Sequence, residues 1–75
     1  MHTLDAKRLL CPMPVIRTQD KVKTLTMGDI LQVTCTDHGA LNDIPAWCRI
    51  NGHKVIGTRQ DEDEIIITIE VGDGI

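Results

Sequence analysis

The amino-acid sequence predicts an α+β fold, a two-layer α/β sandwich in which two helices lie on one face of a mixed four-stranded sheet. Two segments repeat apolar residues at helical spacing, and four others resemble strands in composition or alternation. Their order along the chain is βαβαββ. Two right-handed crossovers would place both helices on the same side of the sheet. With 75 residues, the chain is expected to form one domain over residues 1–75.

The first helix is predicted over about residues 13–26. Pro12 and Pro14 stand where this helix would begin, and proline is tolerated in a first turn because those N–H groups lack an intrahelical partner. A rough apolar face follows the two prolines. Gly28 comes shortly after the segment, as a C-terminal stop would.

The second helix is predicted over about residues 40–51, where Gly52 ends it. Apolar side chains recur there at helical spacing: Leu41, Ile44, Trp47 and Cys48. Pro45 is harmless if the regular helix begins near Ile44, and otherwise it would kink the element.

Four short segments are expected to form the sheet. A first strand is expected around residues 3–5, and a second over 29–36, where Leu31, Val33 and Cys35 point one way. The last two strands are expected over 54–59 and 64–71, joined by a hairpin at the acidic run 61–64. Alternation within 64–71 indicates a sheet with one buried face.

Composition and charge exclude several classes of protein. The formal net charge is −3 and Trp47 is the only aromatic residue. Direct nucleic-acid binding is therefore not expected, because it depends on basic residues and stacking platforms. No apolar run is long enough to span a membrane. The first residues lack the apolar core of a signal peptide and the cysteines are odd in number, so we expect a cytoplasmic protein with free thiols.

Cys11 is the candidate catalytic residue. It falls at the N-terminal end of the first predicted helix, where free N–H groups and the helix dipole favour a reactive thiolate with a lowered pKa. Pro12 and Pro14 are expected to shape the site by stiffening the first turn. No second cysteine or histidine lies beside it, so a lone thiol would carry a group covalently. The alternative is a structural Cys11 that caps the core.

Basic residues near Cys11 are candidates for docking an acidic partner: Lys7, Arg8, Arg17 and Lys21. Lys7 and Arg8 would also lower the thiol pKa if their loop folds back over it. The other reading of these side chains is a solvated charged surface.

Cys35 and Cys48 are expected in the core, on the inward faces of a strand and a helix. A zinc site that uses Cys48 and His53 is disfavoured, because the spacing matches no paired-ligand pattern. A calcium loop at 61–64 lacks the required ligand alternation. We expect no metal and no cofactor.

The chain resembles the TusA/SirA-like sulfur carriers over nearly its whole length. Its N-terminal part carries Leu4-Asp5, Leu9 and Cys11-Pro12-Met13-Pro14-Val15, and its middle carries Thr36-Asp37, the segment Asp43 to Cys48, and Gly52-His53. The resemblance implies a βαβαββ sandwich and a persulfide on Cys11. It also implies a cysteine desulfurase or rhodanese-like sulfur donor, and a downstream acceptor in tRNA 2-thiolation or in sulfur oxidation and trafficking.

Two positions depart from the family pattern. The family usually has glycine where this chain has Arg8, and glycine permits backbone angles that arginine resists. An acidic residue is common between the prolines of tRNA-thiolating members, where this chain has Met13. The pathway therefore stays open. The competing hypotheses are a non-catalytic regulatory or interaction module with a structural Cys11 and, least favoured, an RNA-binding module.

Overall fold

A computed structural model describes residues 1–72 and has the predicted α+β architecture. The order is βαβαββ, so the expectation for the fold class is confirmed. The elements are β1 (His2–Ala6), α1 (Met13–Val22), β2 (Ile30–Cys35), α2 (Ala40–Ile50), β3 (Lys54–Asp61) and β4 (Glu64–Glu70).

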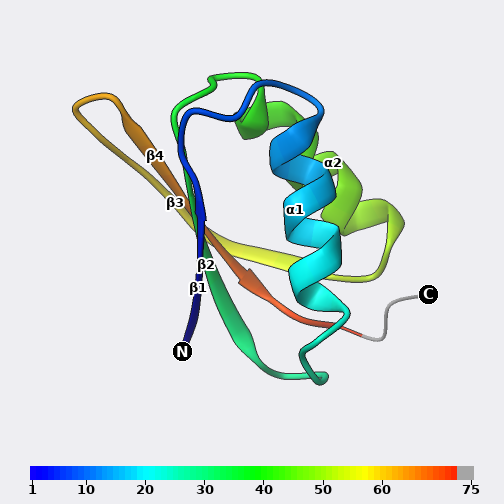
Figure 1. Ribbon diagram of the computed structural model, residues 1–75. Helices are drawn as coiled ribbons and strands as arrows, with labels where there is room; N and C mark the ends of the chain where they lie inside the picture. Colours follow the sequence, from blue (N-terminus) through cyan, green and yellow to red (C-terminus); the bar gives the residue numbers. More distant parts are fainter. Residues whose placement is uncertain (73–75) are drawn as a thin grey trace.

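The four strands form one mixed sheet in the order β1-β2-β4-β3. β1 pairs parallel with β2, whereas β4 runs antiparallel to both β2 and β3. Both helices pack on the same face of this sheet (Figure 1). Each helix returns the chain between parallel strands, so both helices begin at the same end of the molecule.

Residues that alternate along β2 and β4 form the core beneath the helices. Leu31, Val33 and Cys35 are completely buried, as is Ile67, while Gln32 and its outward-facing neighbours are half-buried. This alternation follows from the period of two along a strand. Since α1 and α2 cover only one face, one side of each central strand supplies the core.

The first helix is four residues shorter than predicted, because it ends at Val22. Thr24 donates its hydroxyl to the Lys21 carbonyl, and Thr26 donates its backbone N–H to Asp29 Oδ2 at 2.9 Å. Such local side-chain bonds offer the backbone an alternative to further helical turns. Gly28 therefore lies beyond the helix, in a turn where its φ is +94°.

The second helix begins at Ala40, so Pro45 lies inside it rather than in its first turn. The β3–β4 hairpin falls where the acidic run predicted it, with Glu62 at φ +56° in its turn. β3 extends to Asp61, two residues beyond the expected strand. No helix within residues 1–72 is long and apolar enough to cross a membrane.

Candidate functional site

Cys11 is exposed in the loop that joins β1 to α1. Pro12 follows as the N-cap of α1, and Pro14 is buried in the first turn. The Met13 N–H donates to the Leu10 carbonyl at 2.8 Å, which closes a turn around the cysteine. The predicted placement of Cys11 directly before the helix is confirmed.

Two aspartates hold Cys11, one from the loop after β2 and one from the first turn of α2. The backbone N–H of Cys11 donates to Asp37 Oδ2 at 2.8 Å, and Asp37 Oδ1 accepts the Gly39 N–H at 2.9 Å. The Cys11 thiol donates to Asp43 Oδ2 at 3.0 Å. Asp37 lies just after β2 and Asp43 in the first turn of α2, so the sulfur lies between the N-terminal ends of both helices.

Gly39 provides the space that the sulfur occupies. A Cβ atom at this position would lie 2.8 Å from Cys11 Sγ, which is closer than real Cβ contacts. The backbone of Gly39 has φ −58°, an ordinary helical value that any residue adopts. Glycine is needed here for the sulfur and not for backbone conformation.

The electrostatics of the site correct the expectation of a lowered thiol pKa. Hydrogen bonds to Asp43 first, and then to Asp37, raise the pKa of Cys11 to about 12. The helix N-terminus does favour an anion, but two nearby carboxylates oppose a third negative charge. The resting site therefore holds a neutral thiol. The Gly39 and Cys11 N–H groups lower the pKa of Asp37.

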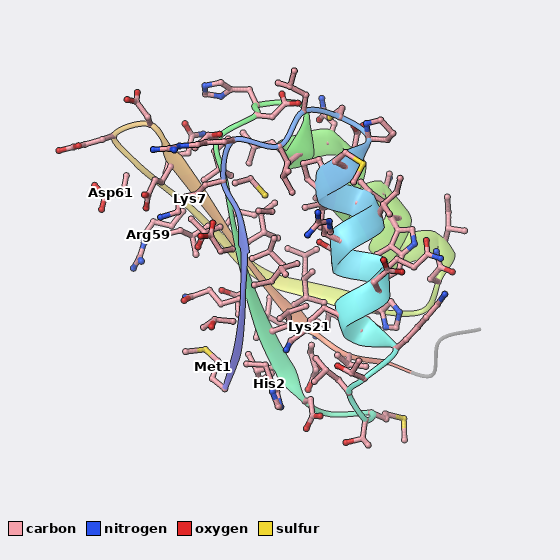
Figure 2. The ribbon with its side chains drawn as sticks, viewed as in Figure 1. Met1, His2, Lys7, Lys21, Arg59 and Asp61 are labelled. Carbon is pink, nitrogen blue, oxygen red and sulfur yellow. The ribbon has the colours of Figure 1, made fainter. Side chains whose placement is uncertain are left out.

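Lys7 and Arg8 do not fold back over the sulfur. Lys7 Nζ lies 3.7 Å from Glu64 Oε2 on β4, and Figure 2 shows Lys7 on the hairpin side of the molecule. Arg8 donates its backbone N–H to Thr36 Oγ1 at 2.9 Å. Both residues line a hollow of about 460 Å³ with Asp5, Thr36, Asp63 and Glu64. Neither Lys7 nor Arg8 is among the groups that shift the pKa of the Cys11 thiol.

The two docking candidates on α1 lie at different distances from Cys11. Arg17 is exposed, six residues past Cys11. Lys21 lies in the last turn of the helix, close to the end of α1 that is remote from the cysteine (Figure 2). Of the two residues, Arg17 is therefore better placed to contact an acidic partner that docks at Cys11.

Cys35 and Cys48 are buried in the core, as predicted, and burial raises the pKa of each thiol to about 11. His53 is also buried. Its ring stacks on Trp47 with centroids 5.0 Å apart, and its Nδ1 accepts the Gly72 N–H at 2.9 Å. Within residues 1–72 no group of three histidine, cysteine or acidic side chains could hold a metal ion.

Comparison with known proteins shows the family to which the chain belongs. The family profile described as "Sulfurtransferase TusA" matches residues 2–71. The chain belongs to the TusA family. It is 42% identical over 69 residues to "Putative sulfur carrier protein YrkI" of Bacillus subtilis, a match that covers 92% of each chain. Its role is accordingly that of a sulfur carrier, which exchanges sulfur with donor and acceptor proteins.

Two further comparisons differ in how much of the other protein the match covers. "Putative sulfur carrier protein YrkF" of Bacillus subtilis is 43% identical over 63 residues, which cover 84% of this chain but only 34% of YrkF. The crystal structure of a SirA-like protein from Desulfitobacterium hafniense has a TM-score of 0.84 at 25% identity. That match covers 97% of this chain and 100% of the other.

Sequence reasoning missed the roles of Gly39, Asp37 and Asp43 around the sulfur. Both aspartates belong to segments that resemble the family, yet each looks like a routine turn or helix-start residue. Their contacts with Cys11 span 26 and 32 residues of sequence. A local pattern carries no signal for contacts of that range.

Proposed function

We propose that this chain accepts a sulfane sulfur atom on Cys11 as a persulfide and passes it to an acceptor protein. The observation that supports this most is that Cys11 is the one exposed cysteine of the described chain, while Cys35 and Cys48 are buried. A partner active site can therefore reach only this thiol. The family membership supplies the sulfur chemistry.

The transfer needs no oxidant. A donor persulfide R–S–SH reacts with the Cys11 thiol to give R–SH and Cys11–S–SH. A new S–S bond forms at Cys11 Sγ, the donor S–S bond breaks, and its electron pair stays on the donor sulfur as the donor thiol is restored. Donors of this chemistry are a cysteine desulfurase or a rhodanese-like protein. The acceptor serves either tRNA 2-thiolation or cytoplasmic sulfur oxidation and trafficking.

Pro12 and Pro14 would support the site by restricting the backbone on either side of Met13, since proline restricts φ. A docked partner would approach the end of the molecule where both helices begin. Free thiols at Cys35 and Cys48 suit a reducing compartment such as the cytoplasm.

Mass spectrometry of the intact protein tests the proposal. Wild-type protein incubated with a cysteine desulfurase and cysteine, or with a rhodanese and thiosulfate, should gain the mass of one sulfur atom. Cys11→Ser should gain none, while Cys48→Ala should still load. Equal loading of Cys11→Ser and wild type would contradict the site. No loading of wild type by either donor would favour the interaction module.

A further inference from the structure

The contact between Cys11 and Asp43 raises a chemical question. The thiolate is the nucleophilic form of cysteine, yet the neighbouring carboxylates raise the pKa of the Cys11 thiol to about 12, so at neutral pH the thiol keeps its proton. Loss of the proton to solvent would leave the Cys11 sulfur, Asp43 and Asp37 negatively charged together. Coulomb repulsion among three such close charges opposes that state.

Transfer of the proton to Asp43 avoids the added charge. The thiol already donates to Asp43 Oδ2 at 3.0 Å, and no other hydrogen bond to the Asp43 carboxylate is present among residues 1–72. Moving the proton across this bond gives a thiolate beside a neutral carboxyl group, so the pair keeps one negative charge. Asp43 is exposed and can afterwards release the proton to solvent.

Asp37 also lies close enough to the thiol to raise its pKa, but it is less suited to this role. Its two carboxylate oxygens accept the backbone N–H groups of Cys11 and Gly39. It therefore ties the cysteine loop to the start of α2. Besides these two N–H groups, the neighbouring His38 lowers the pKa of Asp37, and among residues 1–72 the charged groups that raise the pKa of the thiol are Asp43 and Asp37.

We propose that Asp43 is a second catalytic residue, which takes the Cys11 proton as Cys11 Sγ bonds to the outer sulfur of the donor persulfide. The S–H bond of Cys11 breaks and the proton goes to Asp43 Oδ2. The sulfur electron pair forms the new S–S bond, and the donor leaves with the pair of the old one. This inference rests on the proposed persulfide function.

Gly39 is the positioning residue of this pair. Because a Cβ at Gly39 would lie 2.8 Å from Cys11 Sγ and 3.4 Å from Asp37 Oδ1, Gly39→Ala should shift the sulfur from its present position while Asp43 keeps its carboxylate. The helical φ of Gly39 accepts alanine without backbone strain. The substitution therefore disturbs the hydrogen bond between the Cys11 thiol and Asp43 but keeps the negative charge of Asp43.

The test measures initial rates of sulfur loading between pH 6 and pH 9 with a fixed desulfurase donor. Asp43→Asn keeps the side-chain shape but takes no proton. Wild type should load at a rate that changes little with pH, apart from the donor's own dependence. Asp43→Asn and Gly39→Ala should load about tenfold or more slowly at pH 7, and their rates should climb toward wild type as pH rises.

Asp63→Asn is the matched control, since it removes one exposed carboxylate from the β3–β4 hairpin turn. It should reproduce the wild-type profile. The inference is overturned if Asp43→Asn has the wild-type profile, or if it loads faster than wild type at every pH, as expected of a carboxylate that only shields the thiol. Failure of wild type to load overturns the proposed function instead, so the two failures are distinguishable.

Discussion

The backbone N–H of Arg8 donates to Thr36 Oγ1 at 2.9 Å, while Arg8 itself adopts the left-handed φ of +67°. Three residues later, Cys11 donates its N–H to Asp37. The loop before α1 is thus attached twice to the end of β2. Arginine adopts the backbone conformation for which the family usually has glycine, and the resulting steric strain lies next to the reactive cysteine.

Arg8→Gly should stabilise the protein. Glycine adopts the left-handed region without the Cβ clash, and relief of that clash is worth about 1 kcal/mol. For a domain of this size the unfolding midpoint should rise by roughly 4–8 °C. Thermal unfolding followed by circular dichroism measures this. Arg8→Ala is the control, because it removes the same charge but keeps the strained backbone; equal midpoints for the two variants would contradict the explanation.

Arg17→Glu should slow sulfur loading by a donor with an acidic docking surface. Arg17 lies four residues after Met13, about 6 Å along α1 at ~1.5 Å per residue, which keeps it near the cysteine end of the helix. Charge complementarity acts mainly on the association rate. We expect roughly a tenfold decrease at low salt, which shrinks as salt screens the charges. Lys23→Glu makes the same charge change beyond the far end of α1. An equal decrease in both variants would indicate a general charge effect.

His53 should make the folded state less stable below neutral pH. Burial lowers the pKa of His53, and its Nδ1 accepts a hydrogen bond that protonation at that nitrogen would remove. Between the folded pKa and the unfolded value of about 6.5, the unfolded chain binds more protons, so stability falls as pH falls.

Urea unfolding at several values between pH 7 and pH 5 measures this dependence. His53→Gln should flatten it, whereas His38→Gln should keep the wild-type slope. A slope that survives in His53→Gln would place the titrating group elsewhere.

Local pattern was sufficient to predict the two central strands of the sheet. Side chains alternate strictly along β2 and β4, and the residues expected to face inward, such as Val33 and Ile67, are fully buried. The end of α1 was predicted wrongly because Leu25, although it packs on the core, does so from a turn. The spacing of apolar residues predicts which residues face the core. It does not predict whether a helix or a turn holds each of them there.

The site was only partly predictable. The position of Cys11 follows from the prolines that start α1, so the sequence places the thiol correctly. Its protonation state depends on Asp43, which reaches the sulfur only after β2 and α2 have packed beside the cysteine loop. The helix dipole alone indicated a lowered pKa, and carboxylates from a distant segment reverse that direction.

The topology also decides where another domain can be attached. β1 begins and β4 ends at the same end of the sheet, where His2 pairs with Leu31 and Ile30 pairs with Glu70. Cys11 lies at the other end, where Ala6 pairs with Cys35 and the chain leads into α1, whose ten residues span about 15 Å. A tether attached before His2 or after Glu70 leaves the sulfur uncovered. A fused donor therefore needs at least about five extended residues of linker to reach it.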